Sequence, residues 1–214
     1  MITTLLATIG LVLHLTAPAA AAAAVRQHAR RRQEPRPLST PQRHYDLVTI
    51  GAAVLAVPIV ITEAQWFNHP LLIPAWATTG ALLPCIFWWA SGRSIRRRRR
   101  ATELATLPAA AISEEVLWRA AAPLLLIHWG LPDIMALALS ALGFIALHYR
   151  KNNGLSGLAY MAILTAILWG AALLGGILAA IIVHIFHNLV LAAFEPVRPA
   201  QISAATPPTS RNTW

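Results

Sequence analysis

The chain has 214 residues, of which 57% are hydrophobic and only 12% are charged. A soluble domain carries about 25% charged residues, so this composition argues against an ordinary soluble domain and favours one membrane-embedded bundle. The net charge of +9 does not indicate a nucleic-acid-binding protein. All but one of the 17 lysines and arginines fall between or after the apolar segments, which is typical of membrane orientation signals.

The pattern of apolar segments predicts an all-α, polytopic membrane helix bundle with about seven transmembrane helices, since a span needs about 20 mostly apolar residues. Gly170 or the pair Gly175–Gly176 should separate the last two helices. Pro108 suits a first helical turn, and Pro74, Pro84 and Pro123 are candidate bends. The expected helices cover residues 2–25, 45–65, 71–90, 107–127 and 133–148, and two lie within 155–194.

Three segments follow from this pattern. Residues 1–106 hold three transmembrane helices with basic cytoplasmic loops, and residues 107–194 hold the candidate catalytic core. Residues 195–214 are rich in Pro, Ser and Thr, so we expect a disordered tail.

The basic residues also orient the bundle, because loops rich in Lys and Arg stay in the cytoplasm. With the N-terminus outside and the C-terminus in the cytoplasm, every Lys and Arg of a loop or tail lies on the inner side. We therefore expect a multi-pass protein of the cell membrane. Arg96 to Arg100 should contact anionic lipid headgroups. A cleaved signal peptide at the N-terminus is the alternative, but no Lys or Arg precedes the first apolar segment.

Arg119 is the basic residue that falls inside a span, and it belongs to the cluster Glu114-Glu115-Val116-Leu117-Trp118-Arg119. Ionisable groups at membrane depth are rare and usually mark a functional site. Residues four apart share a helix face, so Glu115 should form an ion pair with Arg119. Glu114 points about 100° away and is the candidate general base. Alone, two glutamates near a helix end are more often a solvated face.

Two further clusters carry imidazoles. His148 follows Phe144 by one turn near the inner end of the fifth expected helix, and His184 and Asn188 lie four apart on the last. His187 lies on a neighbouring face, where we expect packing or a donor to a cavity. Each pattern has an ordinary alternative, such as a helix cap or helix–helix contact. Together, at similar depth, these residues could converge on one cavity open toward the cytoplasm.

The ordered trio Glu-Glu-x-x-x-Arg, Phe-x-x-x-His and His-x-x-x-Asn resembles the three motifs of the CPBP (Abi, CAAX-protease-like) intramembrane proteases. Their eukaryotic relative is the Rce1-type prenyl-protein endopeptidase. The resemblance covers about residues 112–193. It implies that Glu114 activates a water that His148 helps to hold, and that His184 and Asn188 stabilise the oxyanion. Glu115, which could share in the chemistry, and the supporting residues Arg119 and Phe144 would shape the site.

The resemblance also implies a membrane-associated protein or peptide as the substrate, whose identity and prenylation stay open. Family members have been regarded both as metalloproteases and as glutamate proteases. We favour metal-free catalysis with no cofactor. Zinc on Glu114, His148 and His184 is the alternative. No His-Glu-x-x-His motif occurs, which excludes the zincin arrangement.

Other functions compete with this one. Ser156 and His184 could form the dyad of a rhomboid-like serine protease, although the expected topology puts Ser156 at the inner edge and His184 mid-membrane. Buried Glu, His and Arg also suit a proton-coupled transporter, but no duplicated halves are apparent. A non-catalytic immunity or scaffold protein is the remaining alternative.

Overall fold

A computed structural model describes residues 1–32, 40–64, 72–97, 107–149 and 154–197. These residues form seven helices and one two-stranded sheet, when the continuous run α4–η2–α5 counts as one helix. The all-α fold class is therefore confirmed. The helices are α1 (Ile2–Arg32), α2 (Thr40–Glu63), α3 (Ile73–Ala90), α4 (Leu107–Glu115), η2 (Val116–Ala121), α5 (Ala122–His128), α6 (Asp133–Tyr149), α7 (Leu155–Gly175) and α8 (Ile177–Ala193), and the strands are β1 (Ser94–Arg97) and β2 (Phe194–Val197).

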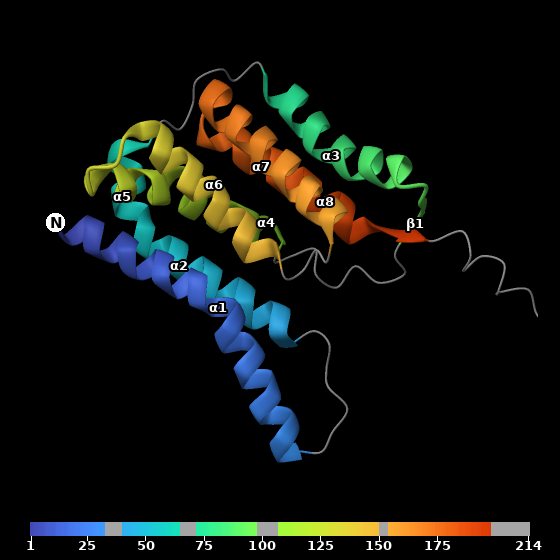
Figure 1. Ribbon diagram of the computed structural model, residues 1–214, viewed down its shortest axis with the longest axis horizontal. Coiled ribbons are helices and arrows are strands. Elements are labelled where there is room, and N and C mark those ends of the chain that lie inside the picture. Colours follow the sequence, from blue (N-terminus) through green and yellow to red (C-terminus); the bar gives the residue numbers. More distant parts are fainter. Residues whose placement is uncertain (33–39, 65–71, 98–106, 150–153, 198–214) are drawn as a thin grey trace, which may run out of the picture.

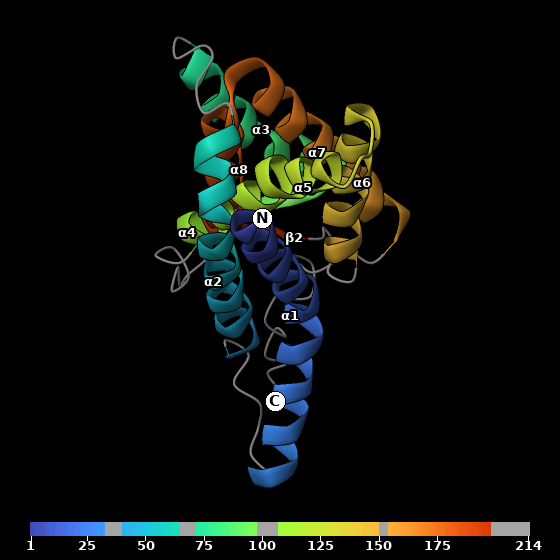
Figure 2. The same cartoon turned by 90° about the vertical axis from the view of Figure 1, so that its left-hand side faces the viewer.

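The helices form two side groups with a central group between them. Figure 1 shows α1 beside α2, and α3 beside α7 and α8, with α4, α5 and α6 in the middle. Figure 2, turned by 90°, shows the C-terminal half of α1 extending past the rest of the bundle. The helices α2, α4 and α8 are packed in that order through direct contacts, so α4 lies at the centre.

Most helix bounds lie near the expected ones. The helix α1 continues to Arg32 and α2 begins at Thr40, both through residues expected in a loop. The last two helices separate at Gly176, whose φ of +82° suits a residue without a side chain, while Gly170 lies inside α7. Pro74 lies in the first turn of α3, where it does not bend a helix, and Pro84 lies inside α3. Pro123 lies inside the continuous run α4–η2–α5, directly after the π turn.

Two stretches are long and apolar enough to cross a membrane by length and composition, namely Tyr45–Glu63 in α2 and Leu155–Gly175 in α7. Three other apolar stretches in the described part of the chain are shorter: Ile2–Ala17, Asp133–His148 and Ile177–Ala193. The count of seven spans, the multi-pass topology and the orientation therefore stay predictions.

Apolar side chains lie on the outside of the bundle and polar ones inside, which is the reverse of a soluble helix bundle. Large apolar side chains point outward on several helices, including Leu5, Val54, Ile86, Leu142 and Ile163. The interior is rich in alanine, and small residues allow close approach of helices. Buried ionisable and polar groups gather where α2, α4, α6 and α8 meet. This arrangement is consistent with a membrane protein that keeps its polar groups inside.

The turn η2 is π-helical, and it follows Glu115 directly. A π turn breaks the regular backbone bonding of a helix and is frequent at functional sites. Here the Trp118 carbonyl accepts a hydrogen bond from the Ser140 hydroxyl of α6. An added Cβ at Gly143 would lie 2.5 Å from the Trp118 ring, so α6 packs closely on this turn. The contact fixes the helix that carries Phe144 and His148.

The strands pair antiparallel, with Arg96 opposite Glu195. Residues up to Val197, which we expected to begin the disordered tail, are therefore part of a strand. The rest of that segment, 198–214, lies outside the described residues. So do Arg98 to Arg100, and the expected lipid contact of the arginine run stays a prediction.

Candidate active site

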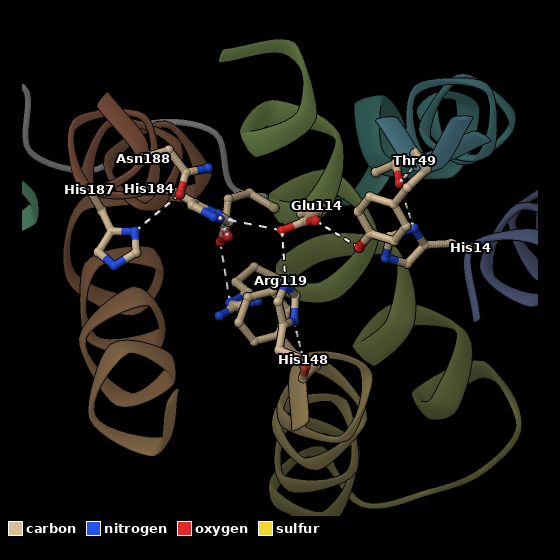
Figure 3. Close-up of polar contacts among 11 residues, drawn as sticks. His14, Thr49, Glu114, Arg119, His148, His184, His187 and Asn188 are labelled. Carbon is tan, nitrogen blue, oxygen red and sulfur yellow. Dashed lines mark hydrogen bonds and ion pairs between the residues drawn. The ribbon is translucent and has the colours of Figure 1, made fainter. Parts of the chain in front are cut away.

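Three helices bring the motif residues together in the interior (Figure 3). Glu114 and Glu115 end α4, His148 lies in the last turn of α6, and His184 lies in the middle of α8. Glu114 is 5% exposed, Glu115 is fully buried and His184 is 3% exposed. The structure thus brings together side chains that are up to 70 positions apart in the sequence, at a depth where each needs partners.

Glu115 is held on both carboxylate oxygens. Its Oε2 lies 3.2 Å from Arg119 Nε, which confirms the ion pair that the four-residue spacing predicts. The two atoms do not have hydrogen-bond geometry. Its Oε1 lies 2.6 Å from His184 Nδ1, so the imidazole donates to the carboxylate there. The Arg119 guanidinium carbon lies 4.0 Å from the centre of the Phe144 ring. Arg119 and Phe144 therefore support Glu115, and Glu115 orients His184.

Glu114 faces two imidazoles with one oxygen. Its Oε2 lies 3.6 Å from His148 Nε2 and 3.7 Å from His184 Nε2. His148 bonds through Nδ1 to the Phe144 carbonyl at 2.9 Å, so Nδ1 carries the proton and Nε2 faces Glu114. This carboxylate and the two rings form an arrangement that can accept, hold and return a proton.

Tyr45 is a site residue that the sequence reasoning missed. Its hydroxyl donates to Glu114 Oε1 at 2.9 Å, and the side chain is buried. Behind it, Thr49 donates to the Tyr45 carbonyl at 2.8 Å, and His14 Nδ1 lies 3.1 Å from the Thr49 hydroxyl. Helices α1 and α2 therefore support the site from outside the recognised motifs. A tyrosine at the start of a span was the available signal, and it is too common to single out.

Asn188 lies one turn beyond His184 on α8 and is half-buried. Its Oδ1 lies 3.1 Å from Nδ1 of the adjacent His187. The described residues include no direct contact of Asn188 with either glutamate. His187 is buried and contacts Tyr160 of α7, so it has a polar partner as well as a packing role.

The serine–histidine alternative does not match this geometry. Ser156 is exposed in the first turn of α7. Both ring nitrogens of His184 face carboxylates, Nδ1 toward Glu115 and Nε2 toward Glu114. A serine nucleophile needs a base within hydrogen-bond reach, and His184 is not available to Ser156 in this arrangement.

Glu114, His148 and His184 are the residues that a zinc ion would use. Both imidazole Nε2 atoms face Glu114 Oε2, and each Nδ1 has an acceptor, as in histidines that bind zinc through Nε2. Within the described ranges, no group of three or more His, Cys, Asp or Glu is arranged to hold a metal ion. Zinc on these three residues therefore stays the alternative. Metal-free catalysis stays a prediction.

A separate cavity of about 200 Å³ lies between α2, α5, α6 and α7. Arg119 lines it, and Glu114 is not among its lining residues. Its walls are mostly apolar, and an exposed pair, Glu63 with His128, lies at 3.6 Å near one end. This cavity is therefore distinct from the carboxylate–imidazole cluster.

Residues 101–190 match the family described as type II CAAX prenyl endopeptidase Rce1-like. The matched segment contains all three motifs, and it agrees closely with the range 112–193 expected from them. The resemblance of this segment to the CPBP and Rce1-type family of CAAX proteases is therefore confirmed. No curated protein and no solved structure matched the chain.

Proposed function

We propose that the chain is an intramembrane endopeptidase in which Glu114 activates a water molecule for attack on a peptide carbonyl. The arrangement around Glu114 Oε2 carries this proposal, with His148 Nε2 at 3.6 Å and His184 Nε2 at 3.7 Å. A buried carboxylate between two imidazoles, in a segment that matches a protease family, suits proton transfer during hydrolysis.

His148 and Glu114 hold the attacking water between them. Glu114 Oε2 and His148 Nε2 lie 3.6 Å apart and are both acceptors, so they do not hydrogen-bond to each other. A water that donates one proton to each would join them. Glu114 takes a proton from this water as its oxygen bonds to the carbonyl carbon. The proton then passes from Glu114 to the leaving amine nitrogen as the C–N bond breaks.

His184 and Asn188 supply hydrogen bonds to the oxyanion. Glu115 Oε1 fixes the His184 ring through Nδ1, so the protonated ring would present Nε2–H toward the reacting carbonyl. The Asn188 amide adds an N–H donor from the next turn. Donors that are fixed in place before the reaction are each worth about 3 kcal/mol of transition-state stabilisation. Arg119 and Phe144 act indirectly, because they hold Glu115 in place.

The substrate would be a membrane-associated protein or peptide that is cut at the cytoplasmic side. The arginine pattern supports that orientation. The family description names CAAX prenyl endopeptidases, so a prenylated CAAX peptide is the first substrate to test. Arg96 to Arg100 would contact anionic lipid headgroups.

The test compares peptide termini in membranes from cells that produce wild-type protein, Glu114→Ala or His148→Ala. We expect new termini with the wild type alone, while both variants accumulate to the same level. The matched control is His128→Ala, because His128 is 42% exposed and lies at the surface pair with Glu63. Termini that persist in the Glu114 variant would overturn the proposal.

Metal analysis of the purified, active protein separates the two mechanisms. The metal-free proposal expects activity to survive chelation. One zinc per chain, together with loss of activity on chelation, would favour the zinc-dependent alternative on Glu114, His148 and His184.

A further inference from the structure

A polar chain of three side chains connects α7 to the end of the motif on α8. Tyr160 Oη lies 2.5 Å from His187 Nε2, and His187 Nδ1 lies 3.1 Å from Asn188 Oδ1. Tyr160 is 8% exposed and His187 is 3% exposed. The Tyr160 ring also packs on Phe87 of α3, with centroids 4.4 Å apart. Neither Tyr160 nor His187 belongs to the three motifs.

The chemistry of these groups determines which of them donates and which accepts in each hydrogen bond. In the described part of the structure, the Tyr160 hydroxyl has no other hydrogen-bond partner than His187. If it accepted a proton from His187, its own O–H would stay buried without an acceptor, which is costly. Tyr160 therefore donates to Nε2, so the neutral ring carries its proton on Nδ1. That Nδ1–H then donates to Asn188 Oδ1.

The order of donors and acceptors, from Tyr160 through His187 to Asn188, sets the orientation of the Asn188 amide. Because Oδ1 accepts from His187, the NH₂ group points to the other side. Figure 3 shows the Asn188 amide nitrogen on the side that faces α4, which carries Glu114. The rings of His184 and His187 are close, with centroids 6.3 Å apart. A flipped amide would present an oxygen, which would repel an oxyanion.

We propose that Tyr160 and His187 are positioning residues that hold the Asn188 carboxamide with its NH₂ group directed at the reacting carbonyl. This inference rests on the proposed endopeptidase function. It gives His187, the imidazole beside the motif, a role in orienting Asn188, and it adds Tyr160 of α7 to the site. The effect falls on kcat and not on KM, because the amide binds the oxyanion of the transition state more strongly than the carbonyl of the substrate.

The kinetic test uses Tyr160→Phe, which removes only the hydroxyl, in proteoliposomes with a fluorogenic farnesylated CAAX peptide. Misorientation of a catalytic group by about 1 Å costs up to about 100-fold, so we expect kcat to fall at least about tenfold with little change in KM. Thr165→Val is the control, because Thr165 is a buried hydroxyl on the same helix without a hydrogen-bond partner among the described residues. This control should keep the wild-type kcat.

A double-mutant cycle shows whether Tyr160 acts through Asn188. In an Asn188→Ala background, Tyr160→Phe should cause no further loss of kcat. An equal loss in both backgrounds would mean that Tyr160 acts by another route, and a wild-type kcat for Tyr160→Phe would also overturn the proposal. Activity that persists in Glu114→Gln would instead refute the proposed function, so the two failures are distinguishable.

Nitrogen NMR of the histidine rings tests this order of donors and acceptors without any substrate. In the wild-type protein, labelled with ¹⁵N-histidine, His187 should carry its proton on Nδ1, and the His187→Gln variant would assign its signals. Protonation on Nε2 alone would overturn the proposal even if Tyr160→Phe did not fold.

Discussion

Replacement of Arg119 by methionine should strongly destabilise the fold. The Arg119 and Glu115 side chains are both 0% exposed, and their ion pair spans 3.2 Å. Removing one partner of a buried pair costs about 3–5 kcal/mol, because the Glu115 charge would stay buried with the His184 N–H as its remaining partner among the described residues. Every 1.4 kcal/mol is a factor of ten, so about 4 kcal/mol shifts the folding equilibrium roughly 1,000-fold. That is a large part of a total stability of about 5–15 kcal/mol.

The assay is reversible unfolding of the purified protein in mixed micelles, followed by tryptophan fluorescence. The double variant Glu115→Gln with Arg119→Met is the matched control. It removes both charges, and the glutamine oxygen can still accept from His184 Nδ1. We expect it to recover most of the stability that Arg119→Met loses. A loss below about 1 kcal/mol for Arg119→Met, or no recovery in the double variant, would refute this reasoning.

Three further substitutions test the packing and the site. Tyr45→Phe removes the hydroxyl that donates to Glu114 at 2.9 Å, so kcat should fall about tenfold while the protein stays folded; an unchanged kcat would contradict a role for this contact. Gly80→Ala would place a Cβ against the Val183 carbonyl oxygen with too little room, so the helices must separate and stability should drop by about 1–3 kcal/mol, seen as a lower melting temperature. Ser156→Ala should leave peptide cleavage unchanged, and its loss would restore the serine-protease alternative.

The helices could be predicted from the sequence because apolar length and glycine position determine them locally. The glycine pair at 175–176 marked the last break correctly, and the four-residue spacing of Glu115 and Arg119 gave the ion pair. The motifs also indicated that Glu114, His148 and His184 would meet. The roles of these residues in catalysis stay predictions.

Features that depend on tertiary packing could not be predicted. The contact of Tyr45 with Glu114 joins residues 69 positions apart and requires α2 to lie against α4. The π turn after Glu115 contains Trp118, whose carbonyl bonds to Ser140 of another helix. Periodicity within one helix carries no information on such partners. The pairing of β1 with β2 was missed for the same reason, since its paired residues are 97 to 103 positions apart.

The most direct test of the account is the turnover number of purified Glu114→Gln in proteoliposomes. Glutamine keeps the size of the side chain but cannot take a proton from water. The control is Glu63→Gln, because Glu63 is 38% exposed at the surface pair with His128. The account predicts that Glu63→Gln cleaves the peptide at the wild-type rate and that Glu114→Gln does not cleave it. Wild-type turnover by folded Glu114→Gln would contradict the central claim.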